Sequence, residues 1–189
     1  MRAMSLAARD RVTFDEFLAM HELPPGSELI DGEVVVADPT FRHNEIVLRL
    51  VLSYAGFAGS SSTGTGRIGI GSTVRAGTHD GFVPDVWWVP AGTDLEPAAN
   101  VFPHAPDIAV EVRSPSTWHS DRGRKLRRYE ALGVAEVWLV DGIDDEVTVH
   151  RRSAGSDVFD VVTTLRTGDV LTTPLVPGWT IDPAELLAR

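Results

Sequence analysis

The 189-residue chain contains no cysteine, which excludes disulfide scaffolds, thiol catalysis, cysteine-ligated zinc and iron–sulfur clusters. Long apolar runs are also missing. The longest uncharged stretch, between Arg49 and Arg67, becomes a Gly/Ser/Thr segment after Phe57, and residues 1–12 contain no apolar block. We therefore expect no transmembrane helix and no secretory signal, and we expect a cytoplasmic protein that does not associate with membranes.

Lysine is almost absent as well. The chain has 17 basic residues, and Lys125 is the only lysine among them. A coding bias toward arginine explains this composition. Under such a bias the lysine either survives by chance or fills a role that the larger, permanently charged guanidinium cannot fill.

The formal net charge is −10 and the isoelectric point is about 4.9. This balance argues against nucleic-acid binding, because phosphate contacts favour a basic surface. Residues 113–128 are an exception, since they hold six basic side chains against the single acid Asp121. The simplest interpretation of this window is a solvated basic helix face.

Apolar periodicity and turn residues predict an α/β domain with a mixed sheet, whose core runs helix, three strands, helix, strand. Helices are expected at 14–21, 42–58 and 120–132, a hairpin at 28–37, and strands at 67–75, 83–89, 107–113, 135–141 and 146–151. We expect residues 1–189 to form one domain, comprising a helix and hairpin at 13–37, the core at about 42–151, and short strands with a last helical turn at 156–189. In the strand 83–89, Trp87 and Trp88 are expected in the core, with a dimer interface as the alternative.

Two carboxylates interrupt otherwise apolar strands. Asp85 lies in the sequence VPDV and Glu111 in VEVR. Burying a carboxylate costs several kcal/mol unless something pairs with it, and two neighbouring strands would bring both groups to one point. Mg²⁺ fits this need because it takes one or two protein carboxylates and keeps waters for substrate oxygens. The alternative is two separate carboxylates at strand ends, satisfied by caps or by Arg113.

Lys125 adds a third element to these carboxylates. Asp121, Lys125 and Tyr129 follow one another at intervals of four residues, so they share one helix face, with Lys125 at the margin of the buried side. A cation beside two carboxylates and a metal suits phosphodiester hydrolysis, because it offsets negative charge that grows on phosphorus. The alternative is an aliphatic stem that covers the core and a solvated ammonium.

The order of the motifs resembles the Uma-two family, a bacterial family of endonucleases in the PD-(D/E)XK restriction-endonuclease-like superfamily. The matching segments are TFDEFL at 13–18, ELIDGE at 28–33, VPDV at 83–86, PDIAVEVRSPST at 106–117, DRGRKLRRY at 121–129, GVAEVWLVD at 133–141 and VPGW at 176–179. The resemblance spans roughly residues 13–187.

This resemblance implies the core described above, with Asp85 and Glu111 as metal-binding carboxylates. In the wider superfamily a lysine follows the glutamate by two residues, where this chain has Arg113. In this family a lysine from the next helix takes the place of that strand lysine, and Lys125 matches it. Arg113 could then contact phosphate, or it could form a salt bridge that blocks the site. Further positions that match the family or could support the site are Glu28, His43, Ser114, Asp121 and Tyr129; for His43 a structural role is the simpler interpretation.

The site residues and the resemblance together predict a metal-dependent endonuclease that uses Mg²⁺ or Mn²⁺. The resemblance implies DNA as its substrate, and cleavage of both strands of a duplex leads us to expect a homodimer. The catalytic residues would be Asp85, Glu111 and Lys125. Two alternatives stay open: a nuclease fold that has lost catalysis and serves as a binding or assembly module, and a hydrolase that uses the same carboxylates on another substrate.

Overall fold

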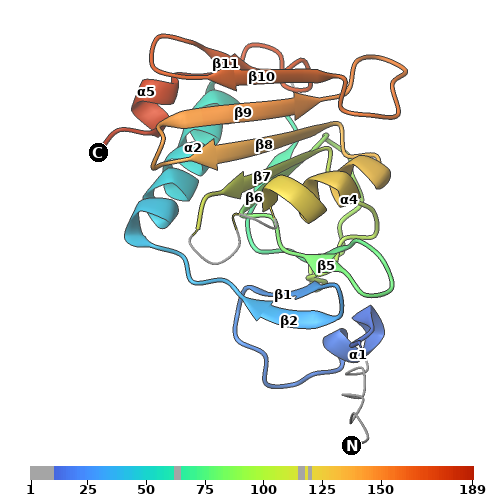
Figure 1. Cartoon of the computed structure of the whole chain (residues 1–189). Helices are drawn as coiled ribbons and strands as arrows, with labels where there is room; N and C mark the ends of the chain where they lie inside the picture. Colours follow the sequence, from blue (N-terminus) through green and yellow to red (C-terminus); the bar gives the residue numbers. More distant parts are fainter. Residues whose placement is uncertain (1–10, 62–64, 115–117, 119–120) are drawn as a thin grey trace, which may run out of the picture.

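The computed structural model describes residues 11–61, 65–114, 118 and 121–189. Its largest element is a six-stranded sheet, which can be followed in Figure 1. The strands are β3 (Arg67–Gly69), β6 (Val86–Val89), β7 (Ile108–Val112), β8 (Glu136–Asp141), β9 (Glu146–Arg151) and β10 (Val161–Leu165). Their order is β10-β9-β8-β7-β6-β3. Only β7 and β8 run parallel, and all other neighbours are antiparallel, so the predicted mixed sheet is confirmed.

A second, four-stranded sheet lies beside the first and has the order β2-β1-β5-β4. Its strands are β1 (Ser27–Ile30), β2 (Glu33–Val36), β4 (Val74–Arg75) and β5 (Gly81–Phe82). The predicted hairpin turn is confirmed, since Asp31 and Gly32 both have positive φ, at 55° and 76°, as a tight type I′ turn requires. Two short strands, β11 (Leu171–Thr172) and β12 (Thr180–Ile181), pair near the C-terminus.

The helices are α1 (Phe14–Leu18), α2 (Phe41–Ser60), the π-helical segment η1 (Asp121–Lys125), α4 (Leu126–Ala131) and α5 (Pro183–Leu186). Helix α2 begins after Thr40, whose side chain accepts a hydrogen bond from the His43 amide. It packs through Ile46, Leu50 and Tyr54 onto one face of the six-stranded sheet. Helix α4 packs through Tyr129 onto the opposite face, so the sheet lies between two layers (Figure 1).

The side chains of strand β7 alternate between the two faces of the sheet. Ile108, Val110 and Val112 belong to the hydrophobic core under α2, whereas Ala109 belongs to the core under α4. Because side chains alternate along a strand, Glu111 faces the α4 side. Trp87 and Trp88 of β6 are 9% and 5% exposed, which confirms their place in the core.

Two of the predicted strands have wrong boundaries. The stretch 67–75 divides into β3 of the large sheet and β4 of the small one, with Gly71 at a φ of 71° between them. The stretch 83–89 begins as a strand only at Val86, because Pro84 has no amide hydrogen to donate to a neighbouring strand. Asp85 therefore precedes the strand and does not interrupt it.

Two predicted helices also differ from the observed ones. The capping box of Thr13 and Glu16 is present, but α1 ends at Leu18 and not at residue 21. The predicted helix 120–132 is a π-helical segment followed by six α-helical residues, and residue 120 lies outside the described part. Across the described residues, no helix combines the length and the apolar character that a membrane crossing needs.

Candidate active site

Six of the nine predicted site residues line one cavity of about 220 Å³. Its polar lining comes from the small sheet, α2, the start of β6, β7 and the end of η1. These polar residues are Glu28, His43, Asn44, Asp85, Glu111, Ser114 and Lys125. Much of the remaining wall is apolar, including Val47, Ile70, Val83 and Pro84. The cavity therefore surrounds a few charged groups with a partly water-excluding wall.

The two predicted metal-binding carboxylates are neighbours across two strands. Val86 of β6 pairs with Val110 of β7 in antiparallel register. Asp85 comes directly before Val86, and Glu111 directly follows Val110, so both lie next to the same pair at one end of β6. The Asp85 side chain also reaches β7, where Oδ2 accepts the amide of Val112, the neighbour of Glu111, at 2.7 Å.

Glu111 is held by the helix on its side of the sheet. Its side chain is 2% exposed, and Tyr129 donates its hydroxyl hydrogen to Oε1 at 2.7 Å. The ammonium of Lys125 lies 3.3 Å from Oε2. Lys125 and Tyr129 are four residues apart and therefore share a helix face, which confirms that part of the predicted arrangement.

Lys125 is buried, not marginal. Its side chain is 2% exposed, and Nζ lies 2.8 Å from Oε1 of Glu28, itself 3% exposed. The predicted place at the margin of the buried side is therefore wrong, and so is the alternative of a solvated ammonium. Glu28 belongs to strand β1, which covers the helix face that carries Lys125. Oε1 of Glu28 also accepts a hydrogen bond from the Val83 amide at 2.8 Å. A buried cation between two buried carboxylates results.

One of the two carboxylate oxygens of Asp85 contacts neighbouring residues of the fold. Oδ2 accepts the Val112 amide at 2.7 Å and lies 3.0 Å from Nε2 of His43. Among the described residues, Oδ1 accepts no hydrogen bond, and the side chain keeps 24% of its exposure. His43, for which a structural role was the simpler interpretation, is 7% exposed and holds this carboxylate. Such contacts orient a carboxylate toward a ligand.

Arg113 lies apart from these carboxylates. Its guanidinium contacts Asp141 at 2.6 Å and Asp144 at 3.0 Å. The hydrogen bond to Asp141 is the largest of the effects that raise the pKa of Arg113. Arg113 is not among the residues that line the cavity, so the predicted salt bridge that blocks the site is not formed, and its role as a phosphate contact stays a prediction. The alternative in which Arg113 satisfies Asp85 or Glu111 is not observed either.

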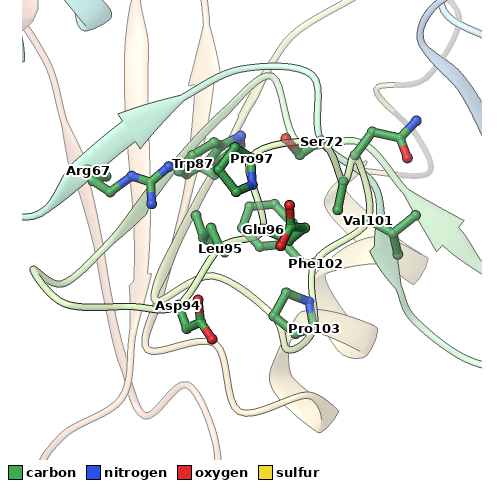
Figure 2. A pocket seen from close by; sticks show the side chains of 12 residues that line it. Arg67, Ser72, Trp87, Asp94, Leu95, Glu96, Pro97, Val101, Phe102 and Pro103 are labelled. Atoms are coloured by element: carbon green, nitrogen blue, oxygen red, sulfur yellow. The ribbon is translucent and has the colours of Figure 1, made fainter.

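The remaining predicted residues divide into two groups. Ser114 is 2% exposed and lines the cavity, as expected of a supporting residue. Asp121 starts η1, but its side chain lies outside the described part. A larger cavity of about 330 Å³, walled by Trp87, Leu95 and Phe102, contains none of the predicted residues (Figure 2).

Four of the six basic side chains in residues 113–128 form ion pairs with carboxylates. They are Arg113, Arg124, Lys125 and Arg128. Arg122, Arg127 and Arg128 are exposed, as a solvated basic face requires, whereas Arg113 and Arg124 are partly buried and Lys125 is fully buried. Sequence reasoning missed the carboxylate Asp80, which binds two of these arginines; the only signal was the spacing of four residues between Arg124 and Arg128.

The donor set suits a hard cation that keeps most of its water. Within the described ranges, no three His, Cys, Asp or Glu side chains cluster closely enough to hold a metal. Mg²⁺ needs only one or two protein carboxylates, which Asp85 and Glu111 could supply. A closed structural site of the zinc type, with four protein ligands, does not fit.

We expect the free energy of unfolding to fall at acidic pH in part because of Asp141. Burial raises the pKa of this carboxyl, but the amides of Asp144 and Ile143 and the ion pair with Arg113 lower it by more. Its stabilising effect is present above the unfolded pKa of about 3.9 and is lost as pH falls through the lower folded value. Urea unfolding from about pH 7 to about pH 3 should show a flatter profile for Asp141→Asn than for wild type; parallel profiles would contradict this.

Comparison with known proteins supports the arrangement of these elements. A solved structure described as a "putative nuclease belonging to DUF820", from Anabaena variabilis ATCC 29413, superposes with a TM-score of 0.78 at 21% identity, covering 93% of this chain and 97% of the other. At that identity the match shows the fold. A search of curated proteins found no match. The family described as "Putative restriction endonuclease", Uma2, matches residues 14–184. Because this match spans most of the length of the chain, the chain belongs to the Uma2 family.

Proposed function

We propose that this protein is a metal-dependent endonuclease that hydrolyses phosphodiester bonds in DNA. The observation that carries the proposal is the meeting of Asp85, Glu111 and the buried Lys125 at one cavity, from three separate elements. Family membership supports nuclease chemistry. The metal, the substrate and the roles of the residues are our inference from the cavity.

In this proposal Asp85 and Glu111 hold Mg²⁺ or Mn²⁺. When bound, such an ion activates a water and draws electron density from the phosphate oxygens. His43 and the Val112 amide orient the Asp85 carboxylate through Oδ2, and Tyr129 orients Glu111. A fixed geometry of this kind lowers the barrier because no group has to reorganise during the reaction.

Lys125 is proposed to stabilise the negative charge that develops on phosphorus. Its ammonium is buried with Glu28 and Glu111, and a charge acts more strongly where water is excluded. The two glutamates offset the cost of burying the cation. Glu28 is thus a supporting residue that holds the Lys125 ammonium in place.

One observation favours the alternative of an inert binding or assembly module. The net charge is −10, and most of the basic segment is engaged in internal ion pairs. Long-range repulsion would therefore slow the approach of DNA. The presence of all three of Asp85, Glu111 and Lys125 favours the enzyme over this module.

Cleavage of several DNA forms separates the two functions. Supercoiled plasmid, linear duplex and single-stranded DNA are incubated with the protein in Mg²⁺, in Mn²⁺ and in EDTA at low salt. We expect nicking of at least one form with either ion and none with EDTA. Absence of cleavage under all metal conditions, with binding retained, would favour the inert module.

We also propose a homodimer, because cleavage of both strands by a small domain needs two active sites and twofold dimers are the commonest closed assembly. Light scattering at the concentration of the cleavage assay should return about twice the chain mass of 20.5 kDa. A single species of 20.5 kDa would show that the protein acts as a monomer.

A further inference from the structure

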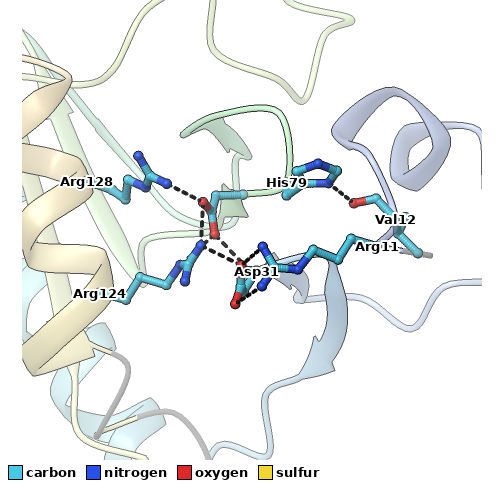
Figure 3. A network of polar contacts seen from close by, with 7 residues as sticks. Arg11, Val12, Asp31, His79, Arg124 and Arg128 are labelled. Carbon is cyan, nitrogen blue, oxygen red and sulfur yellow. Dashed lines mark hydrogen bonds and ion pairs between the residues drawn. The ribbon is translucent and has the colours of Figure 1, made fainter. Parts of the chain in front are cut away.

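A second buried carboxylate, outside the cavity, binds the same helical segment as Glu111. The Asp80 side chain is 2% exposed. Its Oδ1 accepts hydrogen bonds from Nε of Arg124 at 2.8 Å and from the Asp31 amide at 2.9 Å, and its Oδ2 accepts Nη2 of Arg124 at 3.0 Å. Arg128 lies 3.1 Å from Oδ2 (Figure 3). All these donors converge on one side chain.

Two parallel rows of side chains therefore hold this helix. Arg124 and Arg128 both contact Asp80, whereas Lys125 and Tyr129 both contact Glu111. Within each row the residues are four apart, and the rows are offset by one residue. Two buried carboxylates on different parts of the fold thus fix the rotation of the helix about its axis.

The hairpin of the small sheet contacts the same two consecutive cations. Glu28 of β1 pairs with Lys125, and Asp31, in the turn that follows β1, pairs with Arg124 at 3.1 Å. Asp31 also pairs with Arg11 (Figure 3). A movement of Arg124 relative to this hairpin would therefore also move Lys125 relative to Glu28.

The local backbone does not fix this segment by itself. Lys125 is the last residue of the π-helical segment η1 and the N-cap residue of α4. No side chain forms a capping hydrogen bond at this helix start. π-helical turns are rare and less regular than α-helical ones. The position of Lys125 must therefore come from tertiary contacts.

We propose that Asp80 is a positioning residue: through Arg124 and Arg128 it sets the helix rotation that places the Lys125 ammonium between Glu28 and Glu111. Its catalytic consequence rests on the proposed nuclease function, whereas its effect on the place of Lys125 does not. Burial raises the pKa of Asp80, but Arg124, the Asp31 amide and Arg128 lower it by more, so this carboxylate is ionised at neutral pH.

The single lysine makes the proposal directly measurable. Labelling with ¹⁵N-lysine gives one side-chain ammonium signal, that of Lys125. A buried ammonium with carboxylate partners exchanges its protons slowly, so it should be visible in wild type. We expect Asp80→Asn to shift this signal strongly or broaden it beyond detection. An unchanged signal in Asp80→Asn would overturn the proposal.

The matched control is Glu136→Gln. Glu136 is also a buried carboxylate, 1% exposed, with an arginine partner, Arg151, at 2.7 Å, but it lies at the start of β8 and outside the cavity. We expect this variant to lose stability and to keep the Lys125 signal and the turnover. A change of the lysine signal in both variants would mean that general loosening of the fold moves it, and that would also overturn the proposal.

Turnover supplies the second measurement. Asp80→Asn should lower kcat about tenfold to a hundredfold with little change in KM, because misplacement of a reacting group acts on the transition state. If Asp80→Asn does not fold, Arg128→Gln, which removes one partner of Asp80, should give a smaller change of the same kind. If wild type does not cleave DNA, the nuclease function fails, and the lysine signal still decides the role of Asp80.

Discussion

Lys125→Met should lower turnover about 10²–10³-fold, the loss that follows removal of one preorganised electrostatic group. It should also lower the free energy of unfolding by about 3–5 kcal/mol, because Glu28 and Glu111 would remain buried without their cation. A lysine on a helix surface would cost only about 0.5 kcal/mol. The loss of turnover therefore reports the catalytic role of Lys125, and the loss of free energy of unfolding reports its burial between the two glutamates.

A second variant separates the loss of activity from the loss of stability. Adding Glu28→Gln to Lys125→Met removes one of the two buried negative charges, so part of the stability should return while turnover stays low. Lys125→Arg should rescue turnover poorly, because a planar guanidinium cannot occupy the place of an ammonium. Plasmid nicking and urea unfolding measure the two effects. Nicking at the wild-type rate by Lys125→Met would exclude a catalytic role.

Asp85→Asn should remove measurable Mn²⁺ binding and metal-dependent cleavage. Asparagine keeps a side-chain oxygen for the Val112 amide, so the fold should be disturbed little, but it removes the negative charge that attracts a hard cation. Glu111→Gln should have the same effect on binding. It should also destabilise the fold, because the buried Lys125 ammonium would lose the negative charge of one of its carboxylate partners.

Titration calorimetry with Mn²⁺ measures this prediction. The control is Asp94→Asn, which changes a carboxylate in the larger cavity (Figure 2). Mn²⁺ binding should survive in Asp94→Asn and disappear in the other two variants. Unchanged binding in both Asp85→Asn and Glu111→Gln would exclude these carboxylates as metal ligands.

The core of the fold could be predicted from the sequence because the patterns that mark its strands and helix are local. The apolar runs around Val86, Val110 and Trp138 mark the central strands, and the Asp31-Gly32 turn marks the hairpin. The period of α2 marks its buried face through Ile46 and Leu50. Each of these patterns repeats within a few residues, so periodicity alone can detect it.

Contacts between distant segments could not be predicted in this way. The burial of Lys125 depends on Glu28, which lies in the four-stranded sheet and far away in the sequence. The division of residues 67–75 between two sheets depends on which strands β3 and β4 meet. A helical wheel shows which residues share a face, but it does not show what covers that face.

Parts of the candidate site followed from residue type. Asp85 and Glu111 stood out because carboxylates are costly among apolar strand residues, and Lys125 stood out as the only lysine. Asp80 gave no comparable signal, since an aspartate in a short loop is common. Its role becomes visible only when Arg124 and Arg128 converge on it.

The central claim is that Asp85 and Glu111 together hold the divalent ion beside Lys125. The most direct test is anomalous diffraction from a crystal of the wild-type protein soaked in Mn²⁺. We predict one strong anomalous peak within bonding distance of both carboxylates, about 2 Å as for other hard, oxygen-bound ions. A well-ordered cavity without such a peak, or a peak elsewhere on the protein, would contradict the account.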